Sequence, residues 1–245
     1  MSAAALAQAQ KAPSTYEPTS GQEGKDVVWV PTPQVVVDKM LDMAKVTPGD
    51  FVMDLGSGDG RTVITAAKRG ARALGIEYNP DMVELSKRNA EKEGVTGKAT
   101  FIKADLFETD FSRASVITMF LLPDINLKLR PKILALKPGT RIVSNSFTMG
   151  DWQMDETATL TSDAGCNTSW CTAHLWIVPA HVAGNHRLPQ GELTLKQQFQ
   201  MLSGNLRTEG KTFALEGKVR GEEITFKAGG REYRGKMNGT RLELR

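Results

Sequence analysis

The sequence predicts an α/β fold in which a doubly wound, mainly parallel sheet is followed by a small antiparallel β extension. Between residues 29 and 150, short apolar runs alternate with amphipathic helical stretches, as in a parallel sheet covered on both faces. After Trp152 the period changes to short alternating strands, which glycine punctuates beyond Pro179. The length of 245 residues suits one good-sized domain and a small appendage.

Composition and charge exclude several classes of protein. Hydrophobic residues at 40% and charged residues at 24% are ordinary globular proportions, so the chain is neither collagenous nor disordered throughout. The longest apolar run, 116–122, is far shorter than the roughly 18 to 20 residues that cross a bilayer. Residues 181–245 hold 12 basic and 7 acidic side chains, a net of +5. Without a dense basic run, this excess is more typical of a solvated face than of a nucleic-acid surface.

The first 27 residues predict a disordered leader, because they are rich in small and polar residues and lack an apolar period. Residues 3–9 are Ala-rich, like the end of a secretory signal, but neither a basic nor an apolar region precedes them. The start is thus either plainly disordered or the remnant of a signal peptide. We expect a cytoplasmic protein, with export as the alternative. The expected domains are the leader 1–27, a ligand-binding domain 28–180 and a β-rich extension 181–245.

The elements of the first domain follow in order. Thr32 and Pro33 suit the N-cap and first position of a helix. Asn79 and Pro80 predict another helix start, and a helix over 125–136 is expected to break or kink at Pro131. The other elements expected are strand 51–55, helix 61–69, strand 73–78, strands 100–104, 116–121 and 141–146, and a hairpin of 157–161 with 172–178.

The extension contains two similar segments, 217–226 and 235–244. In each, apolar and polar residues alternate and a two-residue turn interrupts the alternation. This pattern predicts an antiparallel meander or a small closed sheet.

The most informative segment is Asp54-Leu-Gly56-Ser-Gly58-Asp-Gly60-Arg61, between a strand and a helix. Glycine lets the backbone turn sharply and lets a ligand lie against it, while free N–H groups at the helix start face the ligand. Glu77 ends the next strand, 21 residues after Gly56, where a carboxylate can accept both hydroxyls of a ribose. The pairing predicts an adenosine-containing ligand.

Both nicotinamide cofactors and S-adenosylmethionine contain adenosine, and two residues favour the second. Arg61 stands where the dinucleotide fingerprint has its third glycine. Asp54 places a carboxylate at the strand end, where it would repel a pyrophosphate and attract an α-ammonium group. A ligand with an amino-acid end is therefore favoured.

These residues resemble the class I (seven-strand) S-adenosylmethionine-dependent methyltransferases, which have a Rossmann-like sheet. The resemblance is carried by Asp54-x-Gly56-x-Gly58-x-Gly60, by Glu77 after the second strand and by Asp105-Leu106 after the third. The segment 30–33, Val-Pro-Thr-Pro, before a helix adds a narrower similarity to a bacterial group that is distantly similar to mitochondrial seven-strand lysine methyltransferases. The resemblance covers residues 29–180. Residues 181–245 have no recognised counterpart, and such appended segments commonly select the substrate.

The resemblance implies S-adenosylmethionine as cofactor and a role for each matching residue. Asp54 would hold the ammonium group, Glu77 the ribose and Asp105 the adenine amino group, while Tyr78 would flank adenine. The three glycines would border the methionine part, and Thr32 and Pro33 would help close the site. The full set of expected cofactor-binding residues is Thr32, Pro33, Asp54, Gly56, Ser57, Gly58, Asp59, Gly60, Glu77, Tyr78, Asp105 and Leu106.

The expected catalytic residues are Asp124 and Asn126, which follow the fourth strand where an acceptor would enter. Asp124 would orient or deprotonate an amine, or would instead cap the helix that follows it. The preceding segment, 119–123, lacks the Asn/Asp-Pro-Pro-Tyr pattern of adenine and glutamine methyltransferases, so a nucleobase is not the expected acceptor. Trp152 either walls an amine channel or packs in the core.

No metal site is expected, because the three histidines lack ligand spacing and the chain has two cysteines. Cys166 and Cys171 flank four residues at the tip of the predicted hairpin. A disulfide is the favoured interpretation, ahead of inert thiols and of a catalytic thiol.

The sequence thus favours an S-adenosylmethionine-dependent methyltransferase that acts on a protein lysine or a small molecule. Two alternatives stay open. One is a nicotinamide-dependent oxidoreductase, and the other is a non-catalytic cofactor-binding scaffold with a partner- or RNA-binding tail.

Overall fold

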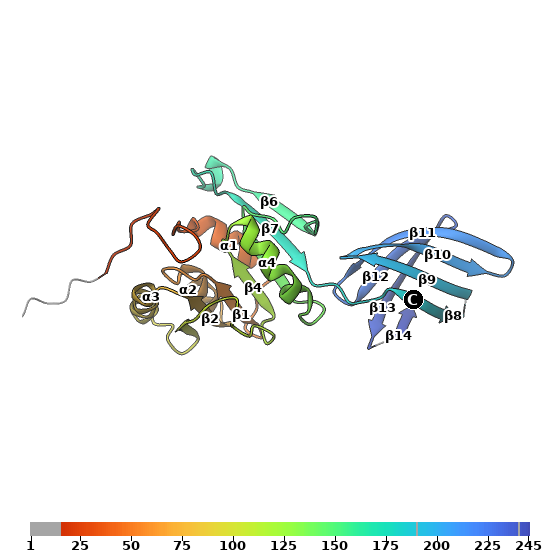
Figure 1. Cartoon of the computed structure of the whole chain (residues 1–245), viewed down its shortest axis with the longest axis horizontal. Helices are drawn as coiled ribbons and strands as arrows, with labels where there is room; N and C mark the ends of the chain where they lie inside the picture. Colours follow the sequence, from red (N-terminus) through yellow and green to blue (C-terminus); the bar gives the residue numbers. More distant parts are fainter. Residues whose placement is uncertain (1–15, 190, 240) are drawn as a thin grey trace, which may run out of the picture.

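The computed structural model describes residues 16–189, 191–239 and 241–245, which form two seven-stranded sheets lying side by side along the long axis of the molecule (Figure 1). The first 15 residues of the predicted leader lie outside the described residues. The rest of the leader has a defined conformation, with Gly21 N donating to Trp29 O at 2.8 Å and Trp29 N to Gln22 O at 2.9 Å.

The first sheet has the order β3-β2-β1-β4-β5-β7-β6, and β7 runs antiparallel to both of its neighbours. The remaining pairs, from β3 to β5, are parallel. This arrangement confirms the predicted fold class. The strands are β1 (Phe51–Leu55), β2 (Arg72–Glu77), β3 (Ala99–Lys103), β4 (Val116–Met119), β5 (Arg141–Asn145), β6 (Glu156–Thr159) and β7 (Thr172–Ile177).

Helices cover both faces of this sheet, because neighbouring strand residues point to opposite sides. Val52 packs in the core shared with three of the helices, whereas Met53 packs in the core on the other face, shared with the fourth. The helices on the first face are α1 (Gln34–Met43), α2 (Arg61–Lys68) and α3 (Pro80–Lys92), and α4 (Pro123–Leu134) lies on the second.

Helix ends were predicted with mixed success. Asn79 caps α3 as expected, since its side chain accepts from Asp81 N at 2.9 Å. The cap of α1 is Pro33 rather than Thr32, and no side chain caps it. Helix α4 continues through Pro131 instead of breaking there, and its N-cap is Leu122, so the interpretation of Asp124 as the cap was wrong.

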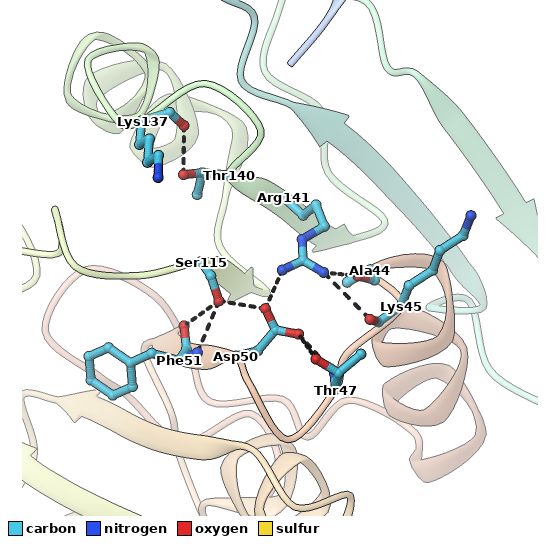
Figure 2. Close-up of polar contacts among 9 residues, drawn as sticks. All are labelled: Ala44, Lys45, Thr47, Asp50, Phe51, Ser115, Lys137, Thr140 and Arg141. Carbon is cyan, nitrogen blue, oxygen red and sulfur yellow. Dashed lines mark hydrogen bonds and ion pairs between the residues drawn. The ribbon is translucent and has the colours of Figure 1, made fainter. Parts of the chain in front are cut away.

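A polar cluster joins α1, β1, β4 and β5 at the amino ends of the parallel strands (Figure 2). Asp50 Oδ1 accepts from Ser115 Oγ at 2.7 Å and forms an ion pair with Arg141, and Asp50 Oδ2 accepts from Thr47 N at 2.8 Å. Arg141 also donates to Ala44 O at 2.7 Å. Burial alone would raise the pKa of Asp50, but the hydrogen bonds and the Arg141 charge outweigh it and lower the pKa.

The second sheet is an antiparallel meander in chain order, as the two repeated segments predicted. Alternate residues of its strands are buried, for example Ile224, Phe226 and Ala228 on β12. The first and last strands, β8 and β14, also come into contact, so the sheet curls towards closure. Its strands are β8 (Gly184–Leu188), β9 (Gly191–Gln198), β10 (Met201–Thr208), β11 (Lys211–Arg220), β12 (Glu223–Ala228), β13 (Arg231–Asn238) and β14 (Arg241–Leu244).

The second sheet follows β7 along the chain (Figure 1). It docks beside the amino end of β5, whereas the glycine-rich loop follows the carboxyl end of β1. Ala180 N donates to Gly221 O at 2.7 Å, and a Cβ on Gly221 would meet the Gly139 Cα at 3.2 Å. The ring of Phe199 stacks on Trp152 with centroids 6.0 Å apart. Trp152 is 1% exposed, so it belongs to the core and not to an amine channel. The predicted boundary at residues 180/181 falls between β7 and β8.

Cys166 and Cys171 form the disulfide that was favoured, with Cα atoms 5.9 Å apart. Both cysteines pack in the core shared with α1, so the loop between β6 and β7 is anchored and is not a free hairpin tip. In the described part of the chain, no helix is long and apolar enough to cross a membrane.

Candidate functional site

A cleft lies at the carboxyl ends of β1, β2 and β4, where two adjoining pockets share Trp29, Val30 and Gly56. We call the first the Glu77 half, which is lined by residues 22–30 and by Glu77, Tyr78, Asn79, Met82, Ala104, Asp105, Leu106, Leu121 and Ile125, among others. The second, the Asp54 half, is lined by Thr32, Met40, Asp54, Ser57, Gly58, Asp59, Arg61, Thr62, Met119 and Phe120, among others.

Glu77 is held rigidly at the end of β2. Its Oε2 accepts from Gly58 N at 2.9 Å, and its Oε1 accepts from Asn79 N at 2.9 Å. Each carboxylate oxygen can accept more than one hydrogen bond, so both remain able to accept from a ligand in the pocket. The pair suits two neighbouring hydroxyl groups.

Asp54 is a buried carboxyl at the end of β1, 5% exposed. Burial, together with the charges of Asp59 and Glu77, raises its pKa to about 7, against hydrogen bonds from Thr118 and Thr62. Thr118 Oγ1 donates to Asp54 Oδ1 at 2.7 Å. A bound cation would stabilise the ionised carboxylate, so this position favours a positively charged ligand group.

The glycine-rich loop has left-handed backbone at Gly56, Gly58 and Gly60, with φ of 75°, 53° and 83°. A Cβ on Gly58 would lie 2.5 Å from the indole nitrogen of Trp29, so this glycine lets the N-terminal segment cover the loop. A Cβ on Gly60 would meet Phe101 at 2.8 Å. Gly60 lies outside the cleft lining, and its role in this structure is packing.

Residues 22–30 form a segment over the Glu77 half. The sequence predicted that the motif at residues 30–33 helps to close the site, but not that residues 22–29 belong to it. Lys25 forms an ion pair with Asp105, and its ammonium lies 4.5 Å from the centroid of the Tyr78 ring. The hydrogen bond from Lys25 lowers the pKa of Asp105. The role of this segment could not be predicted from its composition. Its contacts are made by isolated residues, and isolated residues produce no apolar periodicity in the sequence.

Most of the expected cofactor-binding residues line the cleft, but Pro33 and Gly60 do not, and neither of the expected catalytic residues does. Asp124 is exposed in the first turn of α4. Asn126 is fully buried and donates from Nδ2 to Thr148 O at 3.1 Å. Their neighbour Ile125 does line the Glu77 half. The catalytic roles of Asp124 and Asn126 therefore stay predictions.

Among the described residues, no group of three or more His, Cys, Asp or Glu side chains is placed to hold a metal ion. Burial lowers the pKa of His174, whose Nδ1 lies 3.0 Å from Thr157 Oγ1. The Nε2 atom of His186 lies 2.8 Å from Val182 O. These two histidines make structural contacts.

The hydrogen-bond acceptors that line the cleft fit S-adenosylmethionine. Three carboxyl groups, on Asp54, Glu77 and Asp105, stand at successive strand ends, where a ligand can present an ammonium group, a ribose and an adenine amino group. The same carboxyl groups would repel a pyrophosphate. Gly56 borders both halves, so a ligand can pass from one to the other against bare backbone.

Comparisons with known proteins agree with this chemistry. Residues 54–156 match the model of the ANTKMT methyltransferase domain. A protein-lysine N-methyltransferase of Saccharolobus islandicus is 44% identical over 158 residues, 63% of this chain and 96% of that protein. The adenine nucleotide translocase lysine N-methyltransferase of Mus musculus is 35% identical over 119 residues, 48% of this chain and 52% of that protein. A Salinibacter ruber structure, described as an RNA methyltransferase with S-adenosyl-L-homocysteine, has 44% identity and a TM-score of 0.57, covering 62% of this chain and 96% of that one.

Proposed function

Since the chain belongs to the class I S-adenosylmethionine-dependent methyltransferase family, we propose that it transfers the methyl group to the ε-amino group of a protein lysine. The observation that carries the choice of acceptor is the 44% identity to a protein-lysine N-methyltransferase, almost the whole of which the match spans. The similarity to the adenine nucleotide translocase lysine N-methyltransferase, at 35% identity, also supports a lysine acceptor.

In this proposal, different cleft residues bind different parts of the cofactor. Asp54 would hold the α-ammonium group, Glu77 the ribose hydroxyls and Asp105 the adenine amino group, with Lys25 displaced from Asp105 or shared with it. Trp29 and Val30 border both halves of the cleft and would exclude water from it.

The bound cofactor supplies a methyl group that is already activated on a sulfonium. The chain therefore has to position the acceptor nitrogen and keep water away, and it needs no nucleophilic side chain of its own. A lysine ammonium must lose a proton before its nitrogen reacts. We propose Asp124, at the amino end of α4 beside the cleft-lining Ile125, as the group that orients the amine or accepts this proton, with Asn126 positioning the turn.

A second candidate acceptor is RNA, because the Salinibacter ruber protein of equal identity is described as an RNA methyltransferase. Two features speak against it. The segment after β4 lacks the Asn/Asp-Pro-Pro-Tyr pattern, and the basic excess lies in the second sheet, which docks away from the cleft. A small-molecule acceptor remains a further outcome of the same test.

The acceptor can be identified by incubating the full chain with S-adenosylmethionine carrying a trideuterated methyl group, together with separate protein, RNA and metabolite fractions of a cell extract. We expect the label on lysine residues when the protein fraction is digested and measured by mass spectrometry. Label in RNA or in metabolites, with none in protein, would overturn the lysine assignment. The Glu77→Ala variant serves as the control that transfers little label.

A further inference from the structure

Three half-buried aromatic rings meet at the rim of the cleft, those of Phe120, Phe147 and Trp170, and of these only Phe120 lines the Asp54 half. We define them as the aromatic cluster. Their ring centroids are 5.9 Å apart for Phe120 and Phe147, 5.5 Å for Phe120 and Trp170, and 5.6 Å for Phe147 and Trp170. Each pair is within the range of a stabilising aromatic contact.

The topology places the aromatic cluster at the reacting end of the site. Phe120 follows the carboxyl end of β4, Phe147 follows the carboxyl end of β5, and Trp170 precedes the amino end of the antiparallel β7. All three ends lie at one edge of the sheet. Phe120 also lines the Asp54 half, so the cluster continues outward from the pocket that we assign to the methionine part of the cofactor.

Two local features of the backbone fix the positions of Phe147 and Trp170. Ser146 has φ of 60°, and Phe147 N donates to Asn145 O at 2.7 Å, so a tight three-residue turn directs Phe147 after β5. Trp170 lies inside the loop that the Cys166–Cys171 disulfide closes, and both cysteines pack in the core with α1. The cluster is therefore a fixed surface, although its rings remain partly open to solvent.

The chain's own cations leave these rings free. Lys25, Arg72, Arg113, Arg130 and Lys132 stand over the rings of other aromatic residues. Within the described ranges, no lysine or arginine stands over Phe120, Phe147 or Trp170. An aromatic face attracts an ammonium ion, and it also packs against the methylene groups of an alkyl chain.

We infer that the aromatic cluster is the acceptor subsite, where Trp170 and Phe147 receive an alkylammonium side chain and Phe120 directs its nitrogen towards the methyl group. This inference rests on the proposed function and adds a recognition surface to it. The expected ligand is the side chain of an unmodified lysine, which combines a four-carbon stem with a positive end. We assign specificity to Trp170 and Phe147, since neither lines the two cleft halves assigned to the cofactor.

The first test measures binding without methyl transfer. The full chain, loaded with S-adenosyl-L-homocysteine, is titrated with n-butylammonium and with the uncharged n-butanol, while the indole N–H signals are followed by NMR. The chain has four tryptophans, and the Trp170→Phe variant assigns the signal of Trp170. We expect butylammonium to shift that signal, butanol to shift it much less, and the fully buried Trp176 to stay unchanged. The inference would be overturned if butylammonium left the Trp170 signal unshifted, or if butanol shifted it by as much.

The second test measures the KM for a lysine peptide in matched variants. Trp170→Leu keeps an apolar side chain but removes the π-face, so we expect KM to rise about tenfold, while Trp170→Phe stays close to the native chain. The affinity for S-adenosyl-L-homocysteine should stay unchanged in both. Tyr233→Leu, which removes an aromatic ring stacked on Phe226 in the second sheet, is the control. An unchanged KM in Trp170→Leu would overturn the inference.

The two tests separate this inference from the proposed function. A native chain that binds butylammonium at Trp170 but methylates no lysine peptide would support the subsite and refute the lysine acceptor. A native chain that methylates lysine peptides, with a KM that Trp170→Leu leaves unchanged, would support the acceptor and refute the subsite.

Discussion

Thr118 on β4 donates its hydroxyl hydrogen to Oδ1 of Asp54 on β1 at 2.7 Å, between two residues paired in the sheet register. Both side chains are buried, and this hydrogen bond is one of the few contacts that favour the ionised carboxylate. It therefore opposes the effect of burial, which raises the pKa of Asp54 to about 7. The pH dependence of cofactor binding follows from this pair.

Cofactor affinity should fall as the pH falls through 7. Only the ionised Asp54 attracts the α-ammonium group, so the dissociation constant for S-adenosyl-L-homocysteine should be about tenfold larger at pH 6 than at pH 8. Titration calorimetry at several pH values measures it. Thr118→Val removes the stabilising donor and should move the transition to higher pH. A flat profile between pH 6 and pH 8 would refute the role of Asp54.

Ionised Asp54 should lower the free energy of unfolding of the cofactor-free protein at high pH. The folded-state pKa of Asp54 is raised above its unfolded value, so its contribution to stability falls as the pH rises from about 4 to about 7. Asp54→Asn should therefore increase the free energy of unfolding at pH 8 by about 2 to 4 kcal/mol while weakening cofactor binding. Urea denaturation without cofactor checks it, and a destabilised Asp54→Asn would contradict the account.

Glu77→Ala should weaken cofactor binding by about 2 to 4 kcal/mol, or about 30- to 700-fold, because two charge-assisted hydrogen bonds to the ribose are lost. Glu77 also accepts from Gly58 N and Asn79 N, so circular dichroism has to show that the variant is folded. The control is Glu84→Ala, which removes an exposed carboxylate paired with Lys87 on α3. An unchanged dissociation constant in folded Glu77→Ala would exclude the ribose assignment.

Asp50→Asn should reduce the free energy of unfolding by about 2 to 4 kcal/mol, because Arg141 loses its charged partner at the base of the sheet (Figure 2). The pKa of Asp50 is lowered, so its contribution is present above the unfolded value near 4 and is lost as the pH falls through the folded value. The difference between the native chain and the variant should thus shrink in acid. The exposed pair Arg130–Asp151 is the comparison, and Asp151→Asn should cost less than about 1 kcal/mol.

Phe199→Ala should weaken the docking of the second sheet on the first domain without changing the affinity for the cofactor. The ring covers Trp152 and lies beneath the guanidinium of Arg130, whose centre is 5.1 Å from its centroid, so its loss should cost about 2 to 3 kcal/mol. Calorimetry with S-adenosyl-L-homocysteine should give the native dissociation constant. A large loss of affinity would show that the second sheet reaches the cleft, contrary to its docking beside Gly139.

The regular parts of this molecule could be predicted from its sequence, because they repeat a pattern. Strand β1, its glycine-rich loop and Glu77 at the end of β2 follow from period, turn chemistry and spacing, and the disulfide follows from the short loop between its cysteines. The continuity of α4 through Pro131 could not be predicted, because it depends on the packing of Leu129 and Ile133 in the core on either side of the proline. The N-cap of α1 could not be predicted either, since no side chain caps that helix.

Long-range contacts also left no signal in the sequence. Lys25 meets Asp105 across 80 positions, and Phe120, Phe147 and Trp170 come from three separate loops. Such residues meet only because the sheet order brings their strand ends together. The second sheet docks beside the amino end of β5, and its expected role in selecting the substrate stays a prediction.

The most direct test of the central claim is a calorimetric titration of the full chain with S-adenosyl-L-homocysteine and, separately, with NADH. We predict saturable binding of S-adenosyl-L-homocysteine with one site per chain, which Glu77→Ala weakens, and no measurable heat from NADH. Binding of NADH without binding of S-adenosyl-L-homocysteine would contradict the assignment of the three strand-end carboxyl groups and, with it, the proposed function.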